Sequence, residues 1–347
     1  MLVDSPPETC AQAAPAPPTR RAARAFGLLL SVALLVLVAL ASIAIGAKAL
    51  PLDQVWHGLF HDSGSYGDVV VDERLARTVL GLLAGAALGL SGAVLQALTR
   101  NPLADPGLLG INAGASAAVV TATTCFGVTS LSGYVWFAFA GAAAVGALVW
   151  FLGGSRGATP VRLALAGTAI SAALYGYLQA MMILDDAVLG KMRFWTVGSL
   201  SSASNATTLQ VLPFLAVGTV LALVLARPLN AVEMGDDTAR ALGADLDRTR
   251  ALAMLAAVLL AGAATAACGP IVFVGLMVPH AVRSFTGPDL RWILPYAMVL
   301  SPVLLLGADV AGRVVARPAE LQVGIVTALV GGPVFIFLVR RRRTAQL

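Results

Sequence analysis

An acid and an arginine in one apolar stretch are the residues best placed to do chemistry in this 347-residue chain. Asp309 lies well inside a long apolar run, and Arg313 follows four residues later, so both side chains would share one helix face. Ionisable groups inside a membrane-spanning helix often belong to a proton or ion pathway. A relay needs a chain of such groups, and Asp309 is the one acid placed so deeply. We therefore favour a structural ion pair near the outer interface, which disfavours a proton- or sodium-coupled transporter.

Metal binding has little support in the sequence. His57 and His61 are four residues apart, a spacing that can bind a metal, but no HExxH pattern accompanies them. A solvated amphipathic face is the favoured interpretation. The three cysteines, Cys10, Cys125 and Cys268, are odd in number and far apart, so they suggest neither a disulfide framework nor a metal site.

The chain also lacks a motif that would supply energy. A phosphate-binding P-loop has the pattern GxxxxGK[ST], and the two lysines, Lys48 and Lys191, lie in other contexts. If ATP drives this protein, another polypeptide hydrolyses it. The sequence contains no constellation of nucleophile and base either, so a membrane-embedded enzyme is disfavoured and we expect no catalysis and no cofactor.

The composition indicates an all-α polytopic membrane protein. Hydrophobic residues make up 58% of the chain and charged residues 12%, about half the charged fraction of a soluble domain. The hydrocarbon core of a bilayer is about 30 Å thick and takes about 20 apolar residues per helix. The chain therefore has material for about ten transmembrane helices with short connections.

The apolar runs predict where these helices lie. The third is rich in glycine and alanine, and the eighth is short and broken by Pro279. The ten predicted spans are 26–47, 75–98, 108–127, 134–152, 161–184, 209–226, 250–267, 271–285, 292–312 and 323–339. Together they form a transmembrane domain over 26–340.

Lysine and arginine predict the orientation, because the cytoplasmic side of a membrane protein carries the excess. With ten spans the two termini share a side. That side carries sixteen basic residues, namely Arg20, Arg21, Arg24, Arg100, Arg156, Arg162, Arg227, Arg240, Arg248, Arg250, Arg283, Arg291 and Arg340 to Arg343. The opposite side carries seven, namely Lys48, Arg74, Arg77, Lys191, Arg193, Arg313 and Arg317. We expect a multi-pass protein of the cell membrane with both termini in the cytoplasm.

Both termini are expected to lie outside the bundle. Residues 1–25 are rich in proline, alanine and arginine and are predicted to be a disordered cytoplasmic segment. A secretory signal is the alternative, but the apolar run that follows is long and many spans come after it. Residues 341–347 form a basic cytoplasmic tail.

The largest cytoplasmic connection, 228–250, has features of a docking surface. Two short pieces, 235–242 and 244–251, favour helix and are separated by Gly243. Asp236 or Asp237 could cap the first of them, because carboxylates accept hydrogen bonds from free N–H groups at a helix start. A solvated loop is the alternative, and the charge pattern alone does not decide between the two.

Four segments of the chain resemble the FecCD family, the membrane permeases of ABC importers for ferric siderophores, haem and vitamin B12. They are RNPLADPGLLGINAGA at 100–115, ARALGADLDRTRAL at 239–252, GPIVFVGLMVPHAVRSFTGPDLR at 269–291 and PAELQVGIVTALVGGPVFIFLV at 318–339. The resemblance runs from about Arg74 to the C-terminus, with the motifs in the family's order.

The resemblance implies a type II ABC importer permease bundle, like that of the vitamin B12 importer. The implied partners are two ATP-binding cassette ATPase subunits, an extracytoplasmic substrate-binding protein, a second permease that is identical or a sister chain, and the lipid bilayer; nucleic acid is not among them. Ferric siderophore is the expected cargo ahead of haem and cobalamin. An ion-coupled secondary transporter is the less favoured alternative.

The resemblance also assigns roles to residues at the cytoplasmic side. The residues that would couple to the ATPase are Ala239, Arg240, Ala241, Leu242, Gly243, Ala244, Asp245 and Arg248. Those that would form the cytoplasmic gate are Asn101, Pro102, Leu103, Thr159, Pro160 and Val161. Pro102 disfavours helix at Asn101 and stiffens the turn. The stretch 159–161 departs from the small hydroxyl residues common at this place in relatives.

On the outer side, the resemblance implies that Arg74, Arg77 and Arg313 dock the substrate-binding protein. A guanidinium group can hold a carboxylate with two parallel hydrogen bonds, which suits this task. The alternative for Arg74 and Arg77 is anchoring at the membrane interface, with their charged ends turned toward water.

Overall fold

The computed structural model describes the chain except for residues 1–17, 49, 61–64, 129, 155–159 and 344–347. Every regular element in the described residues is a helix, so the predicted all-α class is confirmed. Cys10, His61 and Thr159 lie outside the described residues, as does most of the predicted N-terminal segment.

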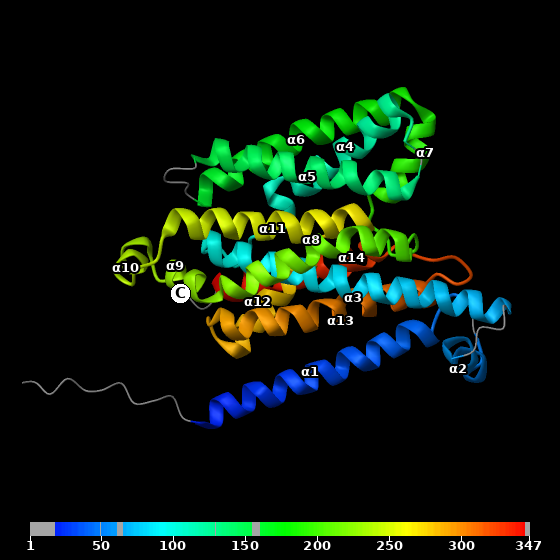
Figure 1. The fold of residues 1–347 in the computed structure, drawn as a ribbon, viewed down its shortest axis with the longest axis horizontal. Helices are drawn as coiled ribbons and strands as arrows, with labels where there is room; N and C mark the ends of the chain where they lie inside the picture. The colour runs from blue at the N-terminus through cyan, green and yellow to red at the C-terminus, as the bar shows by residue number, and fades with distance from the viewer. Residues whose placement is uncertain (1–17, 49, 61–64, 129, 155–159, 344–347) are drawn as a thin grey trace, which may run out of the picture.

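Each of the ten predicted spans corresponds to one helix of the bundle in Figure 1. These are α1 (Pro18–Ala44), α3 (Tyr66–Thr99), α4 (Ile111–Phe126), α5 (Leu131–Gly154), α6 (Pro160–Leu184), α8 (Asn205–Val224), α11 (Leu246–Cys268), α12 (Val274–Thr286), α13 (Leu290–Val315) and α14 (Val323–Arg343). Within the described ranges, seven helices are long and apolar enough to cross a membrane, while α4 and the 323–336 part of α14 are shorter apolar helices.

Two helices begin earlier than the apolar runs predict. The second span was expected from residue 75, but α3 begins at Tyr66 because Ser65 and Asp68 form a capping box. The Ser65 N–H donates to the Asp68 carboxylate at 3.0 Å, and the Asp68 N–H donates to the Ser65 hydroxyl at 3.3 Å. Residues 18–25 were predicted to be disordered, yet α1 already begins at Pro18. Proline is well suited to the first position of a helix, which has no use for its missing N–H.

Short helices lie at the two ends of the bundle. At one end are α2 (Leu52–Phe60), α7 (Asp186–Trp195) and the connection from α13 to α14; we call this the α7 end. At the other are α9 (Ala226–Glu233), α10 (Asp236–Ala241) and the described start of α1; we call this the α10 end. The basic residues predict that the α10 end faces the cytoplasm.

Helix α3 lies in the middle of the bundle, between α11, α12 and α13 (Figure 1). Its glycines allow this close packing, since small residues let helices approach each other in membranes. A Cβ atom added at Gly85 would lie 2.6 Å from the Pro302 Cα atom, and one added at Gly92 would lie 1.8 Å from the Gly275 carbonyl oxygen. Residue 92 therefore cannot carry a side chain without moving α12.

Helix α12 is short because proline and an extended segment interrupt this span. Its 13 residues cover about 20 Å at 1.5 Å per residue, less than the hydrocarbon core. Residues 269–273 before it are not helical, and Phe273 has a positive φ of 71°. Pro279 lacks the N–H that would bond the Gly275 carbonyl. The Gln96 amide donates to the Leu276 carbonyl at 3.0 Å, and it lies 3.5 Å from the Gly275 carbonyl oxygen that Pro279 leaves without a helical donor.

Gly92→Ala is expected to lower the midpoint of thermal unfolding, because overpacking costs about 1–3 kcal/mol. Gly307→Ala in α13 is the matched control, since nothing lies within 4 Å of its added Cβ atom and alanine favours helix. Unfolding midpoints of the detergent-purified proteins check both substitutions. A Gly92→Ala protein as stable as the wild type would contradict the close contact between α3 and α12.

Candidate functional site

Residues 228–250, the predicted coupling loop, fold into short helices that turn at glycine; we call this segment the coupling loop. Helix α10 is followed by Gly243, whose φ is 79°, and the chain then enters α11. The predicted break at Gly243 is confirmed. The second predicted piece, 244–251, is the start of α11, and Asp245 caps it by accepting a hydrogen bond from the Arg248 N–H at 3.0 Å.

The predicted capping of α10 by Asp236 or Asp237 is wrong. Gly235 occupies the N-cap position, and no side chain caps this helix. Asp236 accepts hydrogen bonds from Arg250 at 2.9 and 2.8 Å instead, and it also pairs with Arg100. Burial opposes the charged form of Asp236, but these two arginines hold its pKa below the usual value. Asp236 is therefore ionised at neutral pH.

A small apolar cluster fixes α10 to the bundle. Val232, Ala239 and Leu246 are buried together, one each from α9, α10 and the start of α11. The opposite surface of the loop is accessible: Leu242 is 64% exposed, and the Arg240 side chain is 63% exposed. An exposed leucine next to an exposed arginine is a surface that a partner protein could cover.

Residues 100–110 follow α3 at the same end of the bundle. This segment contains the predicted gate residues Asn101, Pro102 and Leu103, and we call it the gate loop. Asn101 organises its first turn by accepting a hydrogen bond from the Leu103 N–H at 3.0 Å. Asp105 caps the short 3-10 helix Pro106–Leu109 through the Gly107 N–H at 2.8 Å. Burial raises the pKa of Asp105 to about 6.

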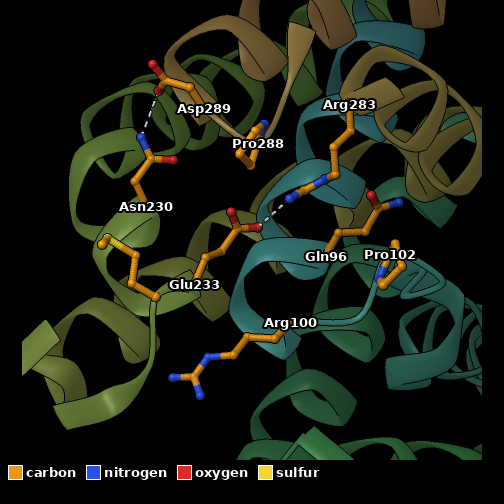
Figure 2. Close-up of a pocket in the computed structure, with 9 residues that line it drawn as sticks. Gln96, Arg100, Pro102, Asn230, Glu233, Arg283, Pro288 and Asp289 are labelled. Atoms are coloured by element: carbon orange, nitrogen blue, oxygen red, sulfur yellow. Dashed lines mark hydrogen bonds and ion pairs between the residues drawn. The ribbon is translucent and has the colours of Figure 1, made fainter. Parts of the chain in front are cut away.

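Two cavities flank this loop. One, of about 430 Å³, is lined by Asn101 and Asp105 together with Val161 and Thr168 of α6, so the structure brings predicted gate residues from both segments together. The Pro160 side chain, like Thr159, is not among the described groups. The second cavity, of about 560 Å³, lies between α3, α9 and α12 and is lined by Pro102. Figure 2 shows it with the ion pair of Glu233 and Arg283 at its wall, where donor and acceptor are 2.8 Å apart.

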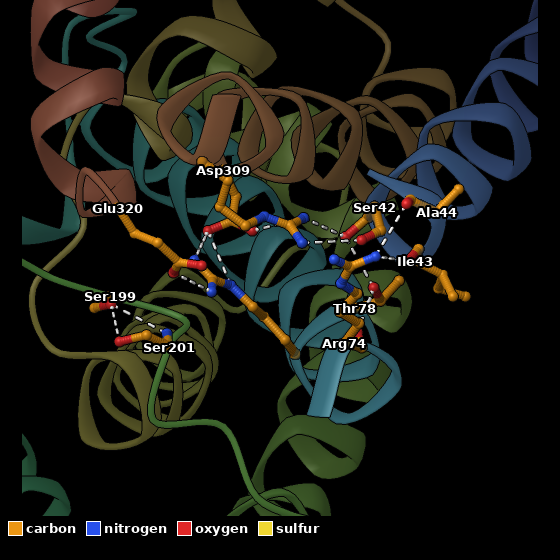
Figure 3. Close-up of polar contacts among 11 residues, drawn as sticks. Ser42, Ile43, Ala44, Arg74, Thr78, Ser199, Ser201, Asp309 and Glu320 are labelled. Atoms are coloured by element: carbon orange, nitrogen blue, oxygen red, sulfur yellow. Dashed lines mark hydrogen bonds and ion pairs between the residues drawn. The ribbon is translucent and has the colours of Figure 1, made fainter. Parts of the chain in front are cut away.

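A cluster of four charged residues, three of them buried, lies toward the α7 end. The predicted pair of Asp309 and Arg313 is present, with 3.1 Å between nitrogen and oxygen. Asp309 also accepts hydrogen bonds from Arg77 at 2.7 and 3.2 Å, and Arg77 donates to Glu320 at 2.7 Å. Figure 3 shows Asp309 and Glu320 turned toward this network. We call these four residues the outer cluster; it joins α3, α13 and the segment before α14.

The arginines of this region also close the end of α1. The last carbonyls of a helix have no partner within it. Arg74 donates to the carbonyls of Ile43 and Ala44, both at 3.0 Å (Figure 3). Arg313 donates to the Ser42 carbonyl at 3.0 Å. The guanidinium groups point into the protein, which differs from the alternative in which Arg74 and Arg77 anchor the chain at the membrane interface.

Docking of a binding protein by Arg74, Arg77 and Arg313 stays a prediction. All three are buried, with at most 9% of each residue exposed, and each already has partners within the chain. A cavity of about 210 Å³ opens beside them and is also lined by Lys48 and Glu320.

Sequence reasoning missed the partners that bring distant segments together. Arg77 and Asp309 are 232 residues apart, and Arg100 and Asp236 are 136 residues apart. Spacing can reveal only the local pair of Asp309 and Arg313. For the contact between Arg100 and Asp236, the available signal in the sequence was the position of Arg100 directly before an Asn-Pro turn. In the part of the chain that the structure describes, no group of three or more His, Cys, Asp or Glu side chains could hold a metal ion.

A bundle of apolar helices with its charged groups gathered near both ends has the architecture of a membrane permease. The chain belongs to the FecCD transport family, whose model matches residues 34–341.

Individual relatives agree with this assignment. The chain is 48% identical over 328 residues to the ferric enterobactin transport system permease protein FepD of Escherichia coli (strain K12), covering 93% of this chain and 96% of that protein. It is 38% identical over 316 residues to the hemin transport system permease protein HmuU of Yersinia pestis, covering 89% and 94%. A solved metal-chelate type ABC transporter in an inward-facing conformation has a TM-score of 0.79 and 29% identity, covering 92% of this chain and 99% of its own.

Asp309→Ala is expected to destabilise the protein by about 3–5 kcal/mol, because Arg77 and Arg313 would stay buried without their shared carboxylate. Glu320→Gln is the matched control: its side chain is 35% exposed, and the expected cost is below about 1 kcal/mol. The difference between the two unfolding midpoints in detergent tests this. Equal effects would contradict a structural role for Asp309.

Proposed function

We propose that this chain is the membrane-spanning permease subunit of a binding-protein-dependent ABC importer that moves a ferric siderophore into the cytoplasm. The observation that carries the proposal is the 48% identity to a ferric enterobactin permease over 93% of the chain. Separate ATPase subunits, two per transporter, would supply the energy. Haem is the second candidate cargo, since the similarity to a hemin permease spans 89% of the chain.

The coupling loop is the proposed contact with the ATPase. Ala239 and Gly243 give the loop its buried support and its turn, while Arg240 and Leu242 present exposed side chains. The other residues assigned to this contact are Ala241, Ala244, Asp245 and Arg248. In this proposal the α10 end faces the cytoplasm, and both termini lie there.

The cavity between α3 and α6 supports a gate at the same end. Asn101 and Val161 both line it, so a shift of either segment would change its width. Pro102, Leu103, Thr159 and Pro160 are proposed to complete the gate. A second permease, identical or a sister chain, would supply the facing half of the passage.

The α7 end is the proposed contact with the substrate-binding protein. Arg74, Arg77 and Arg313 keep their docking role in this proposal; because they are held inside the chain, they would act by supporting this surface. Lys48 and Glu320 line the cavity that opens there and could meet charged groups of the partner. Exposed charge pairs of this kind orient a partner more than they add affinity.

The complete transporter in liposomes is expected to accumulate radiolabelled ferric siderophore only when both ATP and the ATPase subunits are present. Parallel assays, in which haem or cobalamin competes with the labelled siderophore, identify the cargo. Accumulation by the purified permease alone, driven by an ion gradient, would refute the proposal and favour a secondary transporter.

Reversing charge on the coupling loop, with Arg240→Glu and Arg248→Glu together, is expected to lower uptake about tenfold, as losing a coupling free energy between sites would. The thermal midpoint should not change, because both side chains are exposed. Arg291→Glu is the matched control, since its side chain is 60% exposed and pairs with Asp289 two residues away. Undiminished uptake by the double variant would remove the loop from the coupling role.

A further inference from the structure

Arg100 is the residue at which α3 ends and the gate loop begins. Its backbone is left-handed, with φ 49° and ψ 30°, and its N–H donates to the Ala97 carbonyl at 3.2 Å. The next N–H, that of Asn101, donates to the Gln96 carbonyl at 3.1 Å. A non-glycine residue in this conformation costs free energy and persists only where its surroundings hold it. The conformation of Arg100 therefore fixes the direction in which the gate loop leaves the helix.

The Arg100 side chain crosses to the coupling loop. Its Nε atom donates to the Val232 carbonyl at 2.7 Å, and its Nη2 atom pairs with the Asp236 carboxylate. Val232 lies near the end of α9, and Asp236 is the first residue of α10. One guanidinium group thus bridges the turn between these two helices. Figure 2 shows Arg100 reaching away from Gln96 and Pro102.

Asp236 is shared by two arginines. Arg250, near the start of α11, donates to both Asp236 oxygens at 2.9 and 2.8 Å, and its side chain is 13% exposed. This contact ties the start of α10 to α11. The contact with Arg100 then extends the connection from α10 to α3.

The coupling loop has other attachments, but they lead elsewhere. Glu233 pairs with Arg283 of α12, and Asn230 accepts a hydrogen bond from the Leu290 N–H at the start of α13. Neither of these two pairs includes a residue of the gate loop. Among the hydrogen bonds and ion pairs described above, those of Arg100 join the two loops directly.

We infer that Arg100 is a positioning residue that transmits movement of α10 to the cytoplasmic gate. The inference rests on the proposed function, since it requires a partner that moves α10. A displacement of Asp236 either carries the Arg100 side chain with it or breaks the contact. Because Asn101 is the adjacent residue and lines the cavity beside α6, any rotation at Arg100 changes that cavity.

The inference can be tested in the complete transporter, reconstituted with its ATPase subunits and binding protein. Arg100→Gln is expected to keep ATP hydrolysis while lowering the uptake per ATP hydrolysed about five- to tenfold. Asp236→Asn should have the same effect. If the two residues act through one contact, the uptake per ATP hydrolysed by the double variant should be no lower than that of either single variant.

A second measurement separates transmission from a merely structural role. Leu103→Cys, in a background in which Cys10, Cys125 and Cys268 are replaced, reports access to the gate through its rate of maleimide labelling. With Arg100 present, adding ATP and vanadate should change this rate, and with Arg100→Gln the change should disappear. Arg291→Gln, at an exposed pair on the same end, is the control that should keep the change.

The inference would be overturned if Arg100→Gln matched the wild type both in uptake per ATP hydrolysed and in the ATP-dependent change of labelling rate. That result would leave the proposed function intact. Absence of ATP-driven uptake in the wild-type transporter would overturn both. If Arg100→Gln cannot be purified folded, Asp236→Asn and Arg100→Lys take its place and are judged by the same two measurements. Lysine keeps the charge but cannot reproduce the two-partner geometry of the guanidinium group.

Discussion

The position of α3 is the constraint on which the rest of the structure depends. This 34-residue helix carries Arg77 toward one end and Arg100 at the other, about 35 Å apart at 1.5 Å per residue. It can lie in the centre only because glycines such as Gly85 and Gly92 let the backbones of α12 and α13 approach directly. The same helix therefore sets where the outer cluster forms and where the gate loop starts. A change in the packing of α3 would therefore alter the structure at both of its ends.

Between these ends, several buried polar groups of the bundle are paired with neutral partners. Thr265 donates to the Asn112 side chain at 3.0 Å, and Ser91 donates to the Ala257 carbonyl at 3.1 Å. Gln96 donates to the Leu276 carbonyl at 3.0 Å. In lipid, each such group needs a partner within the protein. These neutral bonds hold helices together without placing a charge in the middle of the bundle. This agrees with a conduit in which a separate binding protein supplies the affinity.

The sequence predicted those features that depend on local pattern. Apolar runs gave all ten helices, and Gly243 gave the break in the coupling loop, since glycine readily adopts a positive φ. The prediction for Asp236 was wrong because two arginines from other helices compete for it, and one of them is 136 residues away. Long-range partners of this kind have no signature in spacing. The polar start of α3 was likewise missed because a capping box, rather than an apolar run, determines it.

The interrupted span before α12 bears on how the protein enters the membrane. Beside this extended stretch the chain crosses itself closely: the Ser199 N–H donates to the Cys268 carbonyl at 2.7 Å, and the Gly324 N–H donates to the Gly198 carbonyl at 3.1 Å. Gly324 belongs to α14, which follows the other described helices in the chain. During insertion, the backbone hydrogen bonds around the break are therefore complete only after α14 has been synthesised. A chain interrupted before α14 would leave the Gly198 carbonyl without this donor.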